Sequence, residues 1–131
     1  MTNKPKLPSG EPAIRVVMMP RDTNADGNIF GGTILSLIDQ AAFVEAIRQA
    51  HHRYATVSFK EVVFTEPVYV GDILSLYCET TRIGRTSIAI HIRVCANRRD
   101  NPDVAVHVTE ADVVFVAVDD EGRPVSVIDC D

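Results

Sequence analysis

One segment of the chain, Thr33–Ala50, is helical in composition and differs from everything around it. It carries Leu, Ile, Ala, Gln and Glu without Pro or Gly, whereas the later segments are rich in Val, Ile, Thr and Phe. In its first half apolar residues cover nearly every direction, so this half should be buried. These residues are Ile34, Leu35, Leu37, Ile38, Ala41, Ala42, Phe43 and Val44. The sequence therefore predicts one central helix surrounded by other elements.

The second half of this helix carries a polar face, which we expect to meet solvent. Its members are Glu45, Arg48, Gln49 and His52.

Five apolar, β-branched runs separated by turn signals predict strands. They are Ile14–Met19, Thr56–Phe64, Ile73–Thr81, Ser87–Ala96 and Val104–Val118, with a turn expected at Asn101-Pro102. Their short connections favour antiparallel neighbours, and the length of the last run predicts a bend or bulge within it.

With 131 residues, the chain is long enough for one compact domain with its own hydrophobic core. The helix and the strands have similar lengths, so a sheet can wrap the helix. We expect an α+β fold in which a five- or six-stranded antiparallel sheet surrounds one long central helix. The predicted organisation is a flexible leader over residues 1–12, a single domain over 13–125 and a tail over 126–131.

Charge and cysteine content exclude several classes of protein. The chain has 13 Lys and Arg against 18 Asp and Glu, so its net charge of −5 argues against nucleic-acid binding, and an anionic ligand would need a local basic patch. Cys78, Cys95 and Cys130 show neither disulfide nor zinc spacing. No apolar stretch resembles a signal peptide or a membrane span. We expect a cytoplasmic protein without a metal site.

Asp39 and the pair Gly31-Gly32 are the most informative polar features. Asp39 lies in the apolar half of the helix, either as a structural acid bonded to a neighbour or as a functional one. The glycines either serve packing or a turn, or leave free helix-start amides that stabilise developing negative charge. Eight residues, about 12 Å along a helix, separate Gly31 from Asp39. A reaction that used both would therefore need two subunits.

Two further polar groups are candidates for binding. Asn24 and Asn28, in the loop before the helix, either form a turn or hydrogen-bond a ligand. Arg82–Ser87 joins two strands and carries two guanidinium groups and two hydroxyls, which suit phosphate oxygens unless the segment is only a solvated hairpin turn. The four histidines indicate no shared site.

Asp22–Ala42 (DTNADGNIFGGTILSLIDQAA) resembles the loop and central-helix signature of the hotdog-fold acyl-CoA thioesterases. The likeness is closest to the YciA type and the related brain acyl-CoA hydrolase domains. It continues through Phe64–Asp72 (FTEPVYVGD), Ile83–Ser87 (IGRTS) and Val114–Pro124 (VFVAVDDEGRP), and it spans roughly Ile14–Pro124. The set of motifs is much more specific than the two glycines alone.

The resemblance implies the hotdog fold, dimers that join two sheets, and often hexamers built as trimers of dimers. It also implies hydrolysis of acyl-CoA to free acid and CoA, with no cofactor besides the coenzyme A of the substrate. Asp39 falls on the catalytic carboxylate, acting as general base or nucleophile, and Asn24 on the residue that places thioester or water. Gly31 and Gly32 fall on the amides of the oxyanion hole. The substrate-binding residues would be Asn28, Arg82, Gly84, Arg85, Thr86 and Ser87.

Two positions depart from the wider family pattern. Phe30 stands where many hotdog thioesterases have His, and the YciA type also has Phe at this position. Ser58–Val63 differs from the run found in the family, and we expect it to line the acyl tunnel. Two other functions remain as alternatives: a non-catalytic acyl-CoA-binding or regulatory hotdog protein, and a hydratase or dehydratase acting on acyl thioesters.

Overall fold

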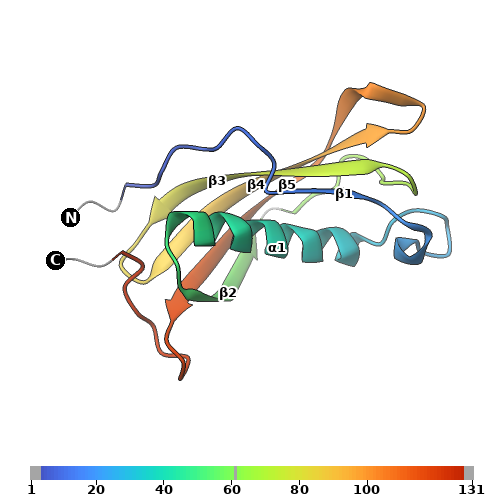
Figure 1. The fold of residues 1–131 in the computed structure, drawn as a ribbon. Coiled ribbons are helices and arrows are strands. Elements are labelled where there is room, and N and C mark those ends of the chain that lie inside the picture. Colours follow the sequence, from blue (N-terminus) through green and yellow to red (C-terminus); the bar gives the residue numbers. More distant parts are fainter. Residues whose placement is uncertain (1–3, 61, 129–131) are drawn as a thin grey trace.

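The computed structural model describes residues 4–60 and 62–128, which form one α-helix and a five-stranded antiparallel sheet (Figure 1). The elements are β1 (Ile14–Val17), a 3-10 turn (Pro20–Asp22), α1 (Gly31–Gln49), β2 (Arg53–Lys60), β3 (Ile73–Ile83), β4 (Ser87–Arg98) and β5 (Asn101–Val118). The strand order is β1-β3-β4-β5-β2, and every neighbouring pair is antiparallel. The predicted α+β fold is confirmed, and the sheet has five strands.

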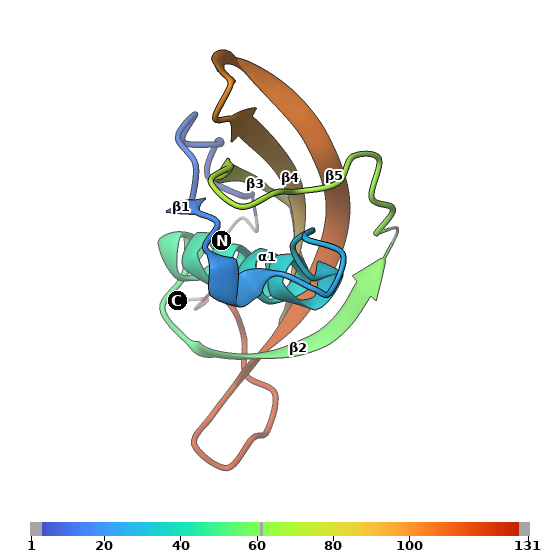
Figure 2. The same cartoon turned by 90° about the vertical axis from the view of Figure 1, so that its right-hand side faces the viewer.

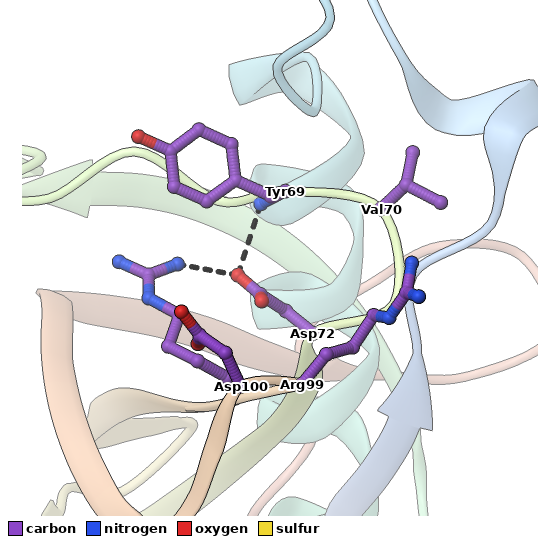
Figure 3. Close-up of a pocket in the computed structure, with 6 residues that line it drawn as sticks. Tyr69, Val70, Asp72, Arg99 and Asp100 are labelled. Atoms are coloured by element: carbon purple, nitrogen blue, oxygen red, sulfur yellow. Dashed lines mark hydrogen bonds and ion pairs between the residues drawn. The ribbon is translucent and has the colours of Figure 1, made fainter.

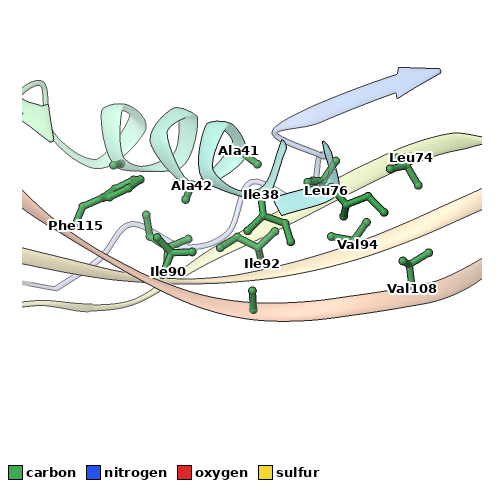
Figure 4. Packing of buried hydrophobic residues seen from close by; sticks show 14 of the residues in the cluster. Ile38, Ala41, Ala42, Leu74, Leu76, Ile90, Ile92, Val94, Val108 and Phe115 are labelled. Carbon is green, nitrogen blue, oxygen red and sulfur yellow. The ribbon is translucent and has the colours of Figure 1, made fainter. Parts of the chain in front are cut away.

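The sheet curls around α1, which lies on its concave side (Figure 2). Alternate residues of β4 face the helix and are almost completely buried: Ile88, Ile90, Ile92, Val94 and Ala96. They meet apolar residues of α1 and of the neighbouring strands, among them Ile38, Ala41, Ala42, Leu76 and Phe115 (Figure 4). Burying one such side chain contributes about 1.5–3 kcal/mol, so this layer holds the helix in the sheet.

β5 is 18 residues long, pairs with β4 and, through its second half, also with β2. Its register with β4 shifts at Val108, which confirms the predicted irregularity in this strand. The predicted turn at Asn101-Pro102 is wrong, because both residues belong to β5. Pro102 is tolerated there because β2 reaches β5 only from Asp112 onward, so this stretch has β4 as its one paired neighbour.

The burial of α1 matches the prediction only in part. Glu45 and Gln49, expected in solvent, are only 4% and 9% exposed. In the first half Ile34 and Ile38 are buried as expected, but other apolar side chains of the helix are open: Leu35 is 36%, Phe43 46% and Val44 45% exposed. Hydrogen bonds allow the polar pair to be buried, whereas no strand of the described residues covers the helix between the edge strands β1 and β2.

Both ends of the described chain contact the domain. The backbone of Lys6 and the side chain of Gln49 exchange two hydrogen bonds, of 2.8 and 3.2 Å. Val127 is 1% exposed. The division into leader, domain and tail stays a prediction, and Cys130 lies outside the described residues. No helix in the described ranges is long and apolar enough to cross a membrane.

Candidate active site

Asp39 lies in the middle of α1 and is held by a neighbouring strand. Its Oδ1 accepts a hydrogen bond of 2.8 Å from the Thr56 hydroxyl. Thr56 points inward because β2 pairs it with the buried Phe115, and the register of β2 shifts between Thr56 and Ser58. Strand irregularities of this kind often aim a side chain at a site. Since no other side chain of residues 4–60 or 62–128 donates to Asp39, the carboxylate is positioned but keeps free acceptor capacity.

A cavity of about 420 Å³ opens beside this carboxylate. Its lining comes from α1, both edge strands and β5: Ile14, Asp39, Gln40, Phe43, Val44, Tyr54, Thr56 and Phe115. Burial raises the pKa of Tyr54 to about 12, and its hydroxyl donates to the Ala50 carbonyl at 2.7 Å. The walls are thus largely apolar and neutral apart from Asp39. A slot of this kind suits an aliphatic chain whose reactive end lies at the acid.

The start of α1 presents free backbone amides. Phe30 occupies the N-cap without a side-chain hydrogen bond, and no described residue accepts from the Gly31 or Gly32 amide. Neither glycine has a positive φ, and a Cβ on Gly32 would enter open space. Backbone strain therefore does not require these glycines. The open amides, together with the helix dipole, favour negative charge at this point.

Asn24 organises the loop before α1, so the turn role anticipated for it is present. Its Oδ1 accepts the backbone N–H groups of Asp26 and Asn28 at 2.9 and 3.1 Å. Both asparagines also line a cavity of about 220 Å³ at the start of the helix. That cavity is formed by Asn24, Asn28, Ile29, Gly31, Ile34, Phe64, Glu66, Pro67 and Val68. Asn24, Asn28 and Gly31 thus come together, but in a different cavity from Asp39.

The Arg82–Ser87 turn lies toward the other end of α1. Thr80, just before it on β3, hydrogen-bonds Glu45 in the second half of the helix. The Gly84 amide donates to the Ser87 carbonyl at 2.8 Å, which closes the turn. The Arg82 and Arg85 side chains are exposed, and neither forms an ion pair with any residue that the structure describes. Two guanidinium groups there are available to an anion.

Arg98 and Arg99 lie near the opposite end of β3, around a cavity of about 520 Å³ (Figure 3). Asp72, which is 2% exposed, accepts hydrogen bonds from the Arg98 guanidinium and from the Tyr69 amide. Arg98 also stacks over the Tyr69 ring, 5.0 Å from its centroid. Because its charge is already paired, Arg98 ties two loops together, and it is a weaker anion site than Arg82 or Arg85.

Sequence reasoning missed Thr56, because a threonine in a strand carries no distinguishing signal. It also missed a cluster on the outer face of the sheet. The His91 ring nitrogens lie 2.9 Å from Asp112 and 3.0 Å from Glu110, and His107 lies 3.6 Å from Glu110. His91 and His107 thus both lie beside Glu110, but these partly exposed ion pairs do not make a binding or catalytic site, and the expectation that the histidines share none stays a prediction. Within the described ranges no group of three or more His, Cys, Asp or Glu residues is arranged to hold a metal ion.

Comparison with known proteins agrees with this architecture. The Thioesterase superfamily model matches residues 26–102. The acyl-CoA thioester hydrolase YciA of Salmonella typhimurium is 38% identical over 126 residues, which cover 95% of each chain. A hexameric hotdog-fold thioesterase of Campylobacter jejuni is 41% identical with a TM-score of 0.85 over 91% of both chains. The hexameric thioesterase of Yersinia pestis is 37% identical with a TM-score of 0.86 over 95% of this chain and 100% of the other.

The chain belongs to the Thioesterase superfamily and has the hotdog fold. Within that family it groups with the acyl-CoA thioester hydrolases of the YciA type. The resemblance found in the motifs is confirmed.

Proposed function

We propose that this protein hydrolyses acyl-CoA thioesters to free acid and CoA, at sites formed between two copies of the chain. The observation that carries the proposal is Asp39, a half-buried carboxylate held by Thr56 beside a largely apolar cavity. Relatives such as YciA, which is named an acyl-CoA thioester hydrolase and matches 95% of the chain, support the substrate class.

The separation of the two cavities supports a shared site. Within one chain, Gly31 and Asp39 are about 12 Å apart along the helix, too far for one carbonyl group to contact both. Leu35, Phe43 and Val44 are exposed on α1, and β2 is an open sheet edge. A two-fold axis there would place the start of one helix beside Asp39 of the other.

We therefore propose a homodimer whose site combines Asp39 of one copy with the helix start of the other. The hexameric state of the Campylobacter jejuni and Yersinia pestis neighbours supports further assembly into a trimer of dimers. The exposed apolar side chains of α1 would then be covered by the facing copy, as expected for a helix that is apolar on most sides.

In the proposed reaction Asp39 removes a proton from water, and the oxygen of that water adds to the thioester carbonyl carbon. The carbonyl oxygen becomes negative and accepts hydrogen bonds from the free Gly31 and Gly32 amides of the facing copy. The C–S bond then breaks, and the CoA thiolate takes up the proton that Asp39 removed from the water, which restores the carboxylate. Asn24 of the facing copy would place the thioester or the water. These steps balance without a metal or redox cofactor.

Asp39 acting as nucleophile is an equivalent route. Its free oxygen would attack the carbonyl carbon and expel the CoA thiolate, leaving a mixed anhydride that water then hydrolyses. The Thr56 hydrogen bond serves both routes, because it fixes one carboxylate oxygen and leaves the other accessible.

The CoA portion would be held by the turn between β3 and β4. Arg82 and Arg85 have no ion-pair partner among the described residues of a chain with a net charge of −5, and Thr86 and Ser87 add hydroxyl donors. A Cβ on Gly84 would come within 2.8 Å of the Ser87 hydroxyl oxygen, so a side chain there would displace the Ser87 hydroxyl. We place Asn28 with Asn24 in the wall of the cavity at the helix start.

The acyl chain would follow the cavity beside Asp39. Of the predicted tunnel segment Ser58–Val63, Phe59 pairs with the buried Val113 and so lies on the inward row of β2. Phe59 is 37% exposed in the single chain, which leaves its ring available to a substrate or a facing copy. Residue 61 lies outside the described residues.

The test is thiol release from a panel of acyl-CoA substrates by wild type and by Asp39→Asn. Loss of the base or nucleophile should lower kcat by at least about 100-fold without unfolding the protein. The exposed Asp120→Asn serves as the matched control and should keep wild-type turnover. Undiminished turnover in Asp39→Asn refutes the assignment. Tight CoA binding by wild type without hydrolysis of any acyl chain would instead support the non-catalytic alternative.

A further inference from the structure

The chain beyond β5 returns to the Arg82–Ser87 turn. After residues 119–123 the Val125 amide donates to the Ala117 carbonyl at 2.8 Å. Two residues later the Val127 amide donates to the Arg85 carbonyl at 2.9 Å, while the Val127 side chain is buried. The next carbonyl of the turn, that of Thr86, accepts the Ala117 amide at 2.8 Å. The returning segment therefore binds the Arg85 carbonyl, and the neighbouring Thr86 carbonyl is bound by β5.

His52 fixes this returning segment to the end of α1. Its Nε2 lies 2.6 Å from the Val127 carbonyl oxygen and donates to it, because a carbonyl can only accept. The His52 ring also packs edge-on against Tyr54, with 6.0 Å between the ring centroids. A continuous series of hydrogen bonds thus runs from His52 through Val127 to the Arg85 backbone.

We propose that residues 124–127 form a latch that sets the conformation of the Arg82–Ser87 turn, and that His52 is a positioning residue for the CoA portion of the substrate. This inference rests on the proposed function, in which that turn meets the CoA phosphates. A guanidinium fork binds a phosphate strongly only in a suitable geometry, and a turn held in advance loses less entropy on binding. None of residues 124–127 lines the cavity beside Asp39, so the latch would control CoA affinity without entering the reaction.

The test compares two substrates that carry the same acyl group, one on CoA and the other on N-acetylcysteamine, which has no phosphate. Because one neutral hydrogen bond is lost, His52→Ala should raise KM for the acyl-CoA about five-fold. Its kcat, and both constants for the N-acetylcysteamine thioester, should stay at wild-type values. His52→Gln, whose amide can reach the Val127 carbonyl, should restore most of the affinity, whereas the shorter His52→Asn should not.

A merely structural role predicts a different result. An equal rise in KM for both substrates, or an unchanged KM for both, would overturn the latch. Calorimetric titration with CoA and with pantetheine checks the same point without turnover, since only CoA affinity should fall in His52→Ala and His52→Asn. If His52→Ala does not fold, the same titrations of His52→Asn test the latch in its place.

Arg85→Ala separates the latch from the proposed function. A wild-type KM for acyl-CoA in Arg85→Ala would remove the phosphate role of the turn, and the latch with it. A raised KM in Arg85→Ala combined with wild-type behaviour of His52→Ala would overturn the latch alone.

Discussion

Two acids on α1, Asp39 and Glu45, lie six residues apart and have opposite surroundings. Each accepts a hydrogen bond from a strand threonine, Thr56 at 2.8 Å for Asp39 and Thr80 at 2.7 Å for Glu45. Glu45 is 4% exposed and saturated with further donors, which come from Arg48 and Gln49 at 2.9–3.0 Å. Asp39 borders an open cavity and has the threonine as its one side-chain donor among the described residues.

The difference shows how one helix can carry a structural acid and a reactive one. Burial alone would raise the pKa of Glu45, but hydrogen bonds from Arg48, Thr80 and Gln49, with the charge of Arg48, hold that pKa below its usual value. Glu45 is therefore ionised and has no acceptor capacity left for a substrate. Asp39 keeps that capacity, and the parts that would complete its site lie on another copy of the chain.

The largest effect should come from removing the saturated acid. Glu45→Ala leaves Arg48, Gln49 and the buried Thr80 without their acceptor, so the free energy of unfolding should fall by about 3 kcal/mol. Asp39→Ala should change it by less than about 0.5 kcal/mol, as expected outside such networks. Urea unfolding at fixed protein concentration measures both. If Asp39→Ala lowered the free energy of unfolding as much as Glu45→Ala, the distinction between a structural and a reactive acid would be contradicted.

A mixing experiment tests whether the open acid is completed by a second copy. Asn24→Ala and Asp39→Asn subunits should each be nearly inactive. In a random mixture half of the dimers are hybrid, and one of their two sites is fully wild type, so activity should recover to about a quarter of wild type. Thiol release after refolding the two variants together measures this recovery. Verified hybrids that stay inactive would contradict the shared site.

The two threonines allow a matched pair of substitutions. Thr56→Val removes the hydroxyl that positions Asp39, and should lower kcat about ten-fold with little change in stability. Thr80→Val leaves Glu45 with one donor fewer, and should lower the free energy of unfolding by about 1–2 kcal/mol with kcat preserved. Turnover and urea unfolding on the same samples separate the outcomes. The reverse pattern would mean that the roles of the two acids are exchanged.

The smallest effect should come from the charged cluster on the outer face of the sheet. Partial burial alone would lower the pKa of His91, but hydrogen bonds and charges of Glu110 and Asp112 outweigh it and raise that pKa. The resulting stabilisation is fully present below pH 6.5 and is lost as pH rises through the folded-state value. Because these groups are partly exposed, less than about 1 kcal/mol should be involved.

Urea unfolding between pH 5 and 9 compares wild type with a variant that combines Glu110→Gln and Asp112→Asn. The wild type should lose stability relative to this variant as pH rises, since only the wild type holds the carboxylates that stabilise the charged His91 ring. If the free energy of unfolding depended on pH in the same way in both proteins, the cluster would contribute nothing to stability. Glu45 would then remain as the acid that stabilises the fold.

Most of the fold could be predicted from hydrophobic pattern and turn signals. These identified α1, all five strands and the irregularity in β5. The burial of α1 could not be predicted in the same way. Periodicity says which side chains are apolar, but not that Thr80 and the backbone of Lys6 would satisfy Glu45 and Gln49. It also cannot show which side of an apolar helix a curled sheet leaves uncovered.

The site was predictable in part for a related reason. Asp39 stands out because an acid is unexpected in an apolar helix, and the two glycines stand out because they directly precede the predicted helix. Thr56 does not stand out, because its role depends on the pairing of β2 with β5 across more than fifty residues of sequence. Spacing along the helix indicated that Asp39 and Gly31 cannot meet within one chain, and the two lie in separate cavities of the structure.

The pairing of β2 with the far end of β5 also governs when the chain can fold during synthesis. Arg53 pairs with Val118, so β2 has no partner strand until β5 has left the ribosome. Until then β2, with the exposed side chains of Val57 and Phe59, lies outside the sheet that β3 and β4 can form beside the helix. Non-local closure of this kind is slow and leaves apolar surface open to aggregation. The unpaired edge of β2 is therefore most open to aggregation just before β5 forms.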